Sequence, residues 1–278
     1  MYKNIEKVCD IRCKLGECPC WDDKKQILYW IDIINKAIHL FNIKNSIAKT
    51  ISLKKYIGSI GLRSNGGIIG ALQDGFYFIN EETNKEKLIK KVKDNSNCKR
   101  FNDGKVDAFG NFWAGTVSYD EKLPIGVLYC LKANLELVKI FNGITISNGI
   151  VWSLDNKKMY FIDTPTMKVN VFDFDIDNNN VRNRRVALEV PKNIGYPDGM
   201  TIDVEGKLWI AHWGGCMLSR FVNIKKTIME IIKVPAERVS SCAFGGENLS
   251  ELFITTARIG FAENLSENVD RNSGYIYR

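Results

Sequence analysis

Short apolar runs, each opened by a polar residue and often a glycine, recur along the chain. In the clearest copy, Asp198 and Gly199 open a run that continues to Ile202, and a turn at Gly206 leads into a second run at residues 208–211. Two runs rich in aromatic and β-branched residues, separated by a glycine-containing turn, are typical of a β-hairpin. An amphipathic helix would instead place apolar residues at a spacing of about 3.6. The pattern therefore predicts strands.

This unit is repeated six times. The equivalent residues of its second run, at intervals of 40 to 49 residues, are Tyr29, Ile69, Trp113, Tyr160, Trp209 and Phe253. A period in the forties with about four strands per unit is typical of a propeller blade, because one small twisted sheet buries both faces only when neighbours pack against it. We predict an all-β fold: a six-bladed β-propeller with four-stranded blades, formed by residues 1–278 as a single domain.

The last repeat is one strand short. It offers strands near residues 239–244, 251–256 and 274–278. The simplest source of a fourth strand is residues 2–8, since such pairing leaves no open sheet edge. We therefore expect the N-terminal strand to close the last blade.

A polar side chain opens most repeats, 11 or 12 residues before the aromatic position. These side chains are Glu17, Asn102, Asn148, Asp198 and Ser241. Equivalent positions form a ring about a propeller axis, and the ring surrounds the central channel if the first strand of each blade is innermost. Asp-Gly and Asn-Gly pairs are also common in turns, so hairpin capping is the alternative. Four acids or amides in register favour a functional channel.

The net charge of +7 does not indicate a nucleic-acid partner. The basic residues are scattered, with modest groups near residues 85–93 and 182–185, and no basic groove with interleaved aromatics accompanies them. The N-terminus is charged, and no apolar run approaches a membrane span. We expect a cytoplasmic location and no membrane or nucleic-acid partner; the oligomeric state stays open, with a monomer compatible.

Cysteine and histidine offer little support for other chemistries. The eight cysteines show no paired CxxC spacing, although Cys13, Cys18 and Cys20 flank Glu17, which leaves a thiolate ligand as a minor alternative. The two histidines, His39 and His212, lie within predicted strands and not at repeat openings. Ser-His-Asp catalysis and histidine-rich metal sites are therefore disfavoured.

An ordered set of motifs resembles one known family. The motifs lie at residues 15–17 (LGE), 100–107 (RFNDGKVD), 147–149 (SNG), 197–200 (PDGM) and 241–246 (SCAFGG). Together they resemble the regucalcin (senescence marker protein), gluconolactonase and luciferin-regenerating enzyme family, in order and over nearly the whole chain. Residues 123–126 and 195–199 look closest to the luciferin-regenerating branch.

The resemblance implies a six-bladed propeller with one divalent metal in its channel. By resemblance, the metal ligands are Glu17, Asn148 and Asp198, and the substrate-contacting positions are Arg100, Asn102 and Asp120. The chain departs from the family pattern at Cys18, where the family usually has glycine, and at Asp120, where it often has glutamate.

The chemistry of this residue set agrees with the resemblance. Two carboxylates and an amide suit a hard cation such as Ca²⁺, Mg²⁺ or Mn²⁺, with Zn²⁺ possible at an open site. A metal on a lactone carbonyl would stabilise the oxyanion of the tetrahedral intermediate. Asp198 could take a proton from the attacking water, Arg100 could orient substrate oxygens, and Asn102 could add a neutral contact.

The expected function is therefore a divalent-metal-dependent, gluconolactonase-like hydrolase with Asp198 as its catalytic base. Its substrate would be a small-molecule lactone, of the sugar-acid type. The alternatives are a non-catalytic calcium-binding or regulatory propeller and a luciferin-regenerating-type hydrolase. Fold analogy alone does not separate these functions, because propellers host many.

Overall fold

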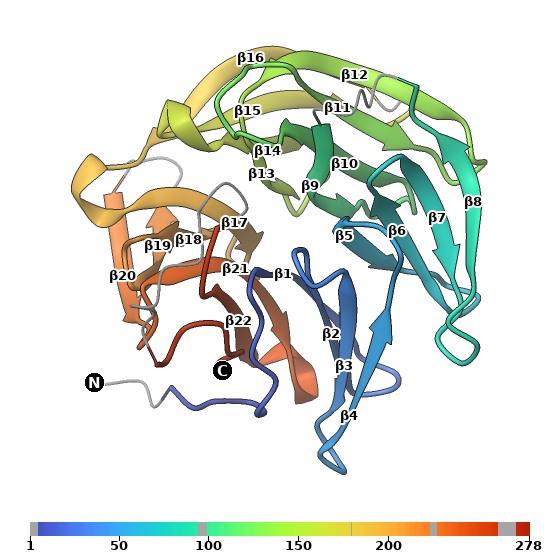
Figure 1. Cartoon of the computed structure of the whole chain (residues 1–278). Coiled ribbons are helices and arrows are strands. Elements are labelled where there is room, and N and C mark those ends of the chain that lie inside the picture. The colour runs from blue at the N-terminus through green and yellow to red at the C-terminus, as the bar shows by residue number, and fades with distance from the viewer. Residues whose placement is uncertain (1–4, 94–98, 179, 223–226, 261–270) are drawn as a thin grey trace.

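Strands arranged about a common axis make up the protein (Figure 1). A computed structural model describes residues 5–93, 99–178, 180–222, 227–260 and 271–278. The helical elements among them are three short 3₁₀ helices: η1 (Thr164–Thr166), η2 (Lys192–Ile194) and η3 (Glu247–Leu249). No helix in these ranges is long and apolar enough to cross a membrane. The predicted all-β class is confirmed.

Four of the sheets each contain four strands, every strand antiparallel to its neighbour. The first contains β1 (Gly16–Asp22), β2 (Ile27–Asp32), β3 (Ala37–Asn42) and β4 (Ile47–Ser52). The second contains β5 (Ile57–Leu62), β6 (Ile68–Leu72), β7 (Gly75–Ile79) and β8 (Glu86–Lys91). The third contains β9 (Lys99–Val106), β10 (Phe112–Ser118), β11 (Gly126–Leu131) and β12 (Leu137–Ile144). The fourth contains β13 (Ser147–Trp152), β14 (Lys158–Asp163), β15 (Lys168–Asp175) and β16 (Asn180–Glu189).

The fifth sheet has six strands and corrects the predicted blade count. It contains β17 (Tyr196–Ile202), β18 (Leu208–Trp213), β19 (Met217–Val222), β20 (Thr227–Lys233), β21 (Arg238–Gly245) and β22 (Glu251–Ala257). The last two predicted repeats join through one residue pair, Trp213 and Arg238, at the end of β18 and the start of β21. The described chain thus forms five sheets, and the prediction of six separate blades is wrong. The four-stranded blade holds for the other four sheets.

Described segments near the two ends of the chain, residues 5–8 and 276–278, lie side by side next to β22 (Figure 1). Lys7 and Ile254 each form an isolated bridge with Tyr277. The backbone N–H of Val8 donates to the carbonyl of Ile276 at 2.9 Å. These are single bridges, so the predicted N-terminal strand is not formed as a continuous strand, and residues 2–4 of that prediction lie outside the described ranges.

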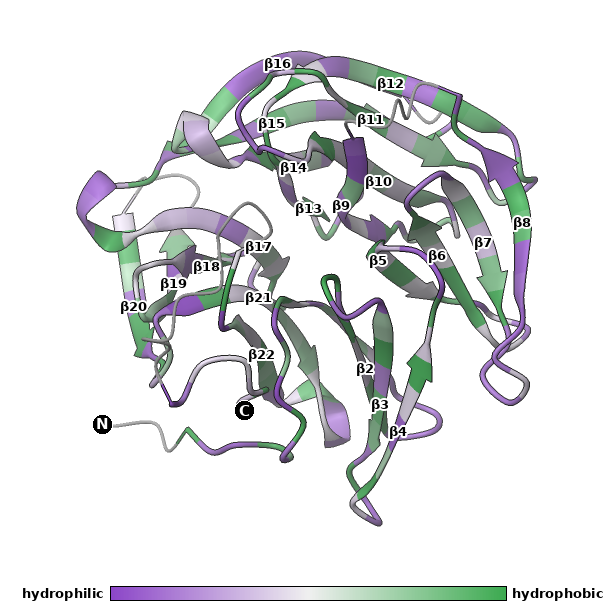
Figure 2. Ribbon diagram, in the orientation of Figure 1, coloured by the Kyte–Doolittle hydropathy of each residue, from purple (hydrophilic) through white to green (hydrophobic). Residues whose placement is uncertain are grey.

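Burial explains why the middle strands carry the strongest sequence signal. Every residue of β6 and β10 is buried, whereas most residues of the outer strands β4 and β16 are exposed or half-buried. Figure 2 shows hydrophilic and hydrophobic segments alternating along the outer strand β16. Trp113 of β10 packs against Trp152 of β13, with ring centres 5.6 Å apart. Strands covered on both faces read as continuous apolar runs.

The first strand of each predicted repeat lies nearest the axis. Contacts join β1 to β5 and β21, β9 to β5 and β13, and β17 to β13 and β21, so these inner strands form a closed ring. Glu17, Asn148 and Asp198 lie within the first three residues of β1, β13 and β17, whereas Asn102 and Ser241 lie in the middle of β9 and β21.

Candidate active site

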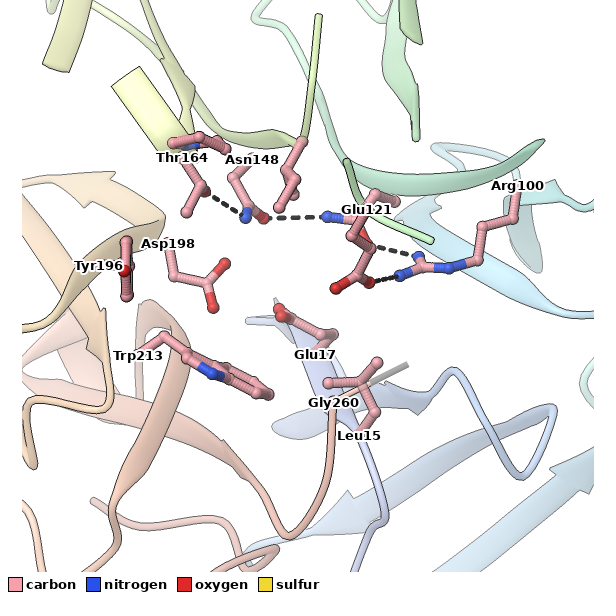
Figure 3. A pocket seen from close by; sticks show the side chains of 13 residues that line it. Leu15, Glu17, Arg100, Glu121, Asn148, Thr164, Tyr196, Asp198, Trp213 and Gly260 are labelled. Atoms are coloured by element: carbon pink, nitrogen blue, oxygen red, sulfur yellow. Dashed lines mark hydrogen bonds and ion pairs between the residues drawn. The ribbon is translucent and has the colours of Figure 1, made fainter. Parts of the chain in front are cut away.

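The inner strands surround a cavity of about 230 Å³. Figure 3 shows its lining, which consists of Leu15, Glu17, Arg100, Asn102, Glu121, Ile146, Asn148, Thr164, Pro165, Tyr196, Asp198, Trp213 and Gly260. All three predicted metal ligands and two of the three predicted substrate-contacting residues are in this set. Glu17 and Asp198, which are 181 positions apart in the sequence, therefore share one cavity.

Strand irregularities lie beside the polar residues. The pairing register shifts between Glu17 and Cys20, between Asn148 and Ile150, and between Pro197 and Met200. A β-bulge at such a shift interrupts the alternation of side chains and re-aims one of them. The repeated bulge explains how equivalent positions of different repeats come to point into one cavity.

The glycines that follow the polar residues serve close packing and not turns. Gly149 and Gly199 lie inside β13 and β17. A Cβ on Gly149 would lie 2.8 Å from the Asp198 carbonyl oxygen, and a Cβ on Gly199 would lie 2.2 Å from Ser241 Oγ. Neighbouring inner strands approach each other closely because these positions lack a side chain. The hairpin-capping alternative is therefore wrong for Asn148 and Asp198.

Glu17 and Asp198 are two buried carboxylates in the same cavity, with exposed fractions of 6% and 4%. Burial raises the pKa of Asp198 well above its ordinary value, and the charge of Glu17 raises it further. Burial also raises the pKa of Glu17, with Asp103 adding to the effect. Among the described residues, Asp198 Oδ1 has no hydrogen-bond partner. A buried carboxylate pair with an unpartnered oxygen fits a bound cation, since buried charges are otherwise costly.

Arg100 is fully buried and fixed by its neighbours. Its Nη2 donates to Glu121 Oε1 at 2.7 Å, and its Nη1 donates to Asn102 Oδ1 at 2.5 Å and to the Phe101 carbonyl at 3.1 Å. The ion pair with Glu121 offsets part of the cost of burying the guanidinium. Arg100 is thus held at the cavity wall with its charge compensated by the protein itself.

A directed chain of hydrogen bonds orients Asn148. Asn102 Nδ2 donates to Asn148 Oδ1 at 3.1 Å, and Asn148 Nδ2 donates to Thr164 Oγ1 at 2.8 Å. The Thr164 hydroxyl in turn donates to the Pro197 carbonyl at 2.8 Å. Because the hydroxyl proton is used on Pro197, Thr164 can only accept from Asn148, so the amide nitrogen faces Thr164. The amide oxygen is turned the other way, where it accepts the hydrogen bond from Asn102 (Figure 3).

Asp120 is not brought into the cavity. It is exposed, and it accepts hydrogen bonds from Ser118 Oγ at 2.6 Å and from the Lys122 backbone at 3.1 Å, which makes it a turn residue. The next residue, Glu121, has a φ of 56° and carries the carboxylate that pairs with Arg100. The acidic side chain at the cavity is thus one position later than the sequence predicts.

Sequence reasoning also missed Thr164, Tyr196 and Trp213. Tyr196, the first residue of β17, and Trp213, the last residue of β18, pair directly opposite each other at the open end of the hairpin, and both line the cavity. The sequence could have indicated them by their positions, because they flank the two predicted strands of the hairpin that Asp198 opens. Thr164 begins η1, and nothing in the sequence distinguishes it from other threonines in turns.

The three cysteines that flank Glu17, considered above as a minor alternative for metal binding, do not line the cavity. Cys18 Sγ accepts the backbone N–H of Ile60 at 3.3 Å, and burial raises the pKa of the Cys18 thiol well above its ordinary value. Cys18 has a φ of 50°, in the left-handed region that favours glycine. Cys18 therefore belongs to the irregular backbone next to Glu17 and is not a ligand in the cavity. Cys13 and Cys20 also lie outside the cavity lining.

One other group in the described chain has the composition of a metal site. Ligand-type atoms of Cys13, Asp32 and His39 lie within 4.8 Å of one another. The Asp32 carboxylate, however, accepts four N–H groups, from the backbone of Lys14, Leu15 and Asn35 and the side chain of Asn35. The indole of Trp30 donates to Cys13 Sγ at 3.3 Å. The group is therefore explained as a hydrogen-bonded loop anchor in the first sheet, away from the cavity.

Comparison with known protein families identifies the family of this chain. The family described as "SMP-30/Gluconolactonase/LRE-like region" matches residues 15–258, which include every residue of the predicted site. The chain belongs to this SMP-30/gluconolactonase/LRE-like family. The resemblance predicted from the motifs is confirmed.

Relatives within the SMP-30/gluconolactonase/LRE-like family carry several names. The chain is 37% identical to "Putative sugar lactone lactonase YvrE" of Bacillus subtilis over 248 residues, which is 89% of this chain and 85% of that protein. It is 36% identical to regucalcin of Danio rerio over 266 residues, which is 95% of this chain and 90% of that protein. A solved luciferin-regenerating enzyme is 30% identical, with a TM-score of 0.90 over 99% of this chain and 94% of that one.

Proposed function

We propose that the protein is a divalent-metal-dependent hydrolase that opens the ring of a small lactone. Membership of a family that includes a lactonase-named relative supports the class of reaction. The observation that carries the metal dependence is the buried pair of Glu17 and Asp198, with Asp198 Oδ1 unpartnered among the described residues. The cavity of about 230 Å³ is the size of a substrate with a single ring.

Glu17, Asn148 and Asp198 are the residues that would hold the cation. They offer oxygen atoms, which suit Ca²⁺, Mg²⁺, Mn²⁺ or, at an open site, Zn²⁺. When bound, the cation polarises the lactone carbonyl as a Lewis acid. A cation also stabilises the ionised form of both carboxylates, whose pKa values burial raises.

The remaining steps belong to the side chains of the cavity. Asp198, whose Oδ1 lacks another partner, accepts a proton from the attacking water as a general base. Arg100, held at the cavity wall by Glu121 and Asn102, orients the oxygens of the lactone through its positive charge. Asn102 uses its amide hydrogens on the Ser147 carbonyl and Asn148, so its main contribution is to hold Arg100 and Asn148 in position.

A lactone panel tests this function. The full chain is stripped of metal with a chelator, and hydrolysis of sugar and alkyl lactones is followed by acid release after adding Ca²⁺, Mg²⁺, Mn²⁺ or Zn²⁺ separately. We expect no turnover without metal and turnover of at least one lactone with one of the cations. Turnover that survives complete chelation would contradict the metal dependence. Stoichiometric metal binding with no turnover of any lactone would instead favour a non-catalytic metal-binding propeller.

We also propose that residues 5–8 and 275–278 together complete the last sheet. Support comes from the backbone hydrogen bonds between Glu6 and Arg278, at 3.1 and 3.0 Å, and from the Arg278 guanidinium, which pairs with both Glu6 and Glu251. Deleting residues 1–9 should lower the melting temperature by about 5 °C or more, because it exposes the outer edge of residues 275–278, which pair with β22. An unchanged melting transition would reject this closure. The single-domain organisation and the cytoplasmic location stay predictions.

A further inference from the structure

Two aromatic side chains form one side of the cavity. Tyr196 and Trp213 pair directly across β17 and β18 and both line the cavity. Figure 3 shows them next to Asp198, on the side away from Arg100 and Glu121. The reacting carboxylate therefore lies between a charged wall and an aromatic wall.

The core does not account for the placement of Tyr196. Its side chain is 55% exposed, while the ring of Trp213 is backed by the guanidinium of Arg238 at 5.5 Å. A single exposed aromatic residue is ordinary on a protein surface. Ligand pockets are typically lined by aromatic side chains with a few polar groups beside them. Two neighbouring aromatic residues in the cavity lining, next to a candidate catalytic acid, fit this pattern.

Further apolar side chains line the same cavity. They are Leu15, Ile146 and Pro165. The polar lining residues are largely committed to one another: Arg100 donates to Glu121 and Asn102, and Thr164 donates to the Pro197 carbonyl. Among the described lining residues, the donors of Arg100 and Thr164 are therefore used mainly within the protein and not on hydroxyl groups of a sugar ring.

The two kinds of wall favour different substituents. A hydroxyl group placed against the face of either aromatic ring would lose its water without gaining a strong hydrogen bond, which is unfavourable. An alkyl group in the same place would gain the free energy of burying apolar surface. The polar wall can still contact the carbonyl and ring oxygen, which every lactone has.

We propose that Tyr196 and Trp213 form an apolar subsite, and that the lactone opened here carries an apolar substituent and not a full set of ring hydroxyls. This inference rests on the proposed lactone hydrolysis and narrows its substrate class from small lactones to alkyl-substituted single-ring lactones. Tyr196 and Trp213 are its specificity-determining residues.

Three substrates with the same ring size test the subsite. They are δ-valerolactone, a δ-lactone with a butyl side chain, and glucono-δ-lactone, each assayed with the metal-loaded full chain. We expect kcat/KM to be at least about tenfold higher for the butyl lactone than for either of the others, since each added methylene in an apolar pocket strengthens transition-state binding. Equal values, or a preference for glucono-δ-lactone, would overturn the proposal.

A matched pair of variants locates the effect. Tyr196→Ser should reduce the preference for the butyl lactone over δ-valerolactone by about threefold or more, because it removes one aromatic face. Phe109→Ser is the control, since Phe109 is 45% exposed, follows β9 in a turn and does not line the cavity. A preference that is unchanged in Tyr196→Ser would remove Tyr196 from the subsite.

A binding measurement separates this inference from the proposed function. If none of the lactones is hydrolysed with any metal, the proposed hydrolysis fails, and calorimetric binding of the butyl-substituted and unsubstituted δ-lactams still tests the subsite. We expect tighter binding of the butyl lactam to the wild-type chain and a smaller difference in Tyr196→Ser. Equal affinities for the two lactams would overturn the apolar subsite by itself.

Discussion

The hydrogen-bond chain on β9 and β13 and the carboxylate pair on β1 and β17 share one cavity but bury their charges differently. Arg100 is compensated by Glu121, and Asn148 is held by hydrogen bonds at both ends of its amide. Glu17 and Asp198 carry like charges, and Asp198 Oδ1 finds no partner in the described chain. The charges of the hydrogen-bonded half, on β9 and β13, are balanced within the protein, whereas the carboxylate half, on β1 and β17, is where we propose that a cation binds.

This difference has a consequence for stability. A satisfied buried network stabilises the fold, whereas two buried carboxylates raise the free energy of the metal-free folded state. Functional sites often carry such a local cost, since the groups are arranged for a ligand and not for the fold. Substitutions in the two halves should therefore act in opposite directions on the metal-free protein, although both reduce activity.

The largest expected effect lies in the carboxylate half. Asp198→Asn removes both a metal ligand and the proton acceptor, so kcat/KM on the best lactone should fall by at least about 10³-fold. The matched control is Asp155→Asn, an exposed turn acid between β13 and β14, which should keep wild-type activity. A metal-loaded Asp198→Asn enzyme within tenfold of wild type would remove Asp198 from catalysis.

A smaller effect is expected in the hydrogen-bonded half. Arg100→Met keeps much of the apolar stem but removes the donors, so kcat/KM should fall by about tenfold or more, which is about 1.4 kcal/mol of transition-state stabilisation. Metal content, measured by elemental analysis after dialysis, should be unchanged because a protonated guanidinium is not a ligand.

The loss of Arg100 also leaves Glu121 without its ion-pair partner. The double variant Arg100→Met/Glu121→Gln removes that uncompensated charge and separates folding from catalysis. Wild-type kcat/KM in a folded, metal-loaded single or double variant would exclude an orienting role for Arg100.

The smallest effect is expected at the junction of the two halves. Thr164→Val removes the hydroxyl that fixes the Asn148 amide, so affinity for the divalent cation should fall up to about tenfold. Thr164→Ser should retain the wild-type affinity because it keeps the hydroxyl. Thr166→Val is the control on the same 3₁₀ helix, since Thr166 donates to the Asp163 carbonyl and does not line the cavity. Equal metal affinity of Thr164→Val and wild type, by calorimetry, would show that Asn148 needs no such positioning.

The sequence was most informative where a polar residue recurs at the same position in most of the repeats. Glu17, Asn148 and Asp198 could be predicted to meet, because their spacing from the buried aromatic residue places each at the start of an inner strand. The strand order of the first four sheets follows from the same pattern, since short connections join neighbouring strands.

The remaining features depend on contacts that no local pattern encodes. The exchange of Asp120 for Glu121 arises from a left-handed residue in a turn, which reverses which side chain faces the cavity. The merging of the last two predicted repeats depends on a single pair, Trp213 and Arg238, 25 positions apart in the sequence. The aromatic wall at Tyr196 becomes visible only once the register of β17 and β18 is known.

Thermal unfolding of wild-type and Asp198→Asn protein, each with and without divalent metal, tests the central claim that Glu17, Asn148 and Asp198 hold a cation. Metal at about 100 times its Kd should stabilise the wild type by about 2.7 kcal/mol, which is about 5–10 °C in melting temperature. Without metal, Asp198→Asn should melt higher than wild type, because one of two buried like charges is gone, and metal should no longer raise its melting temperature. An equal metal-induced shift in both proteins, or a metal-free Asp198→Asn protein that melts lower than wild type, would contradict the account.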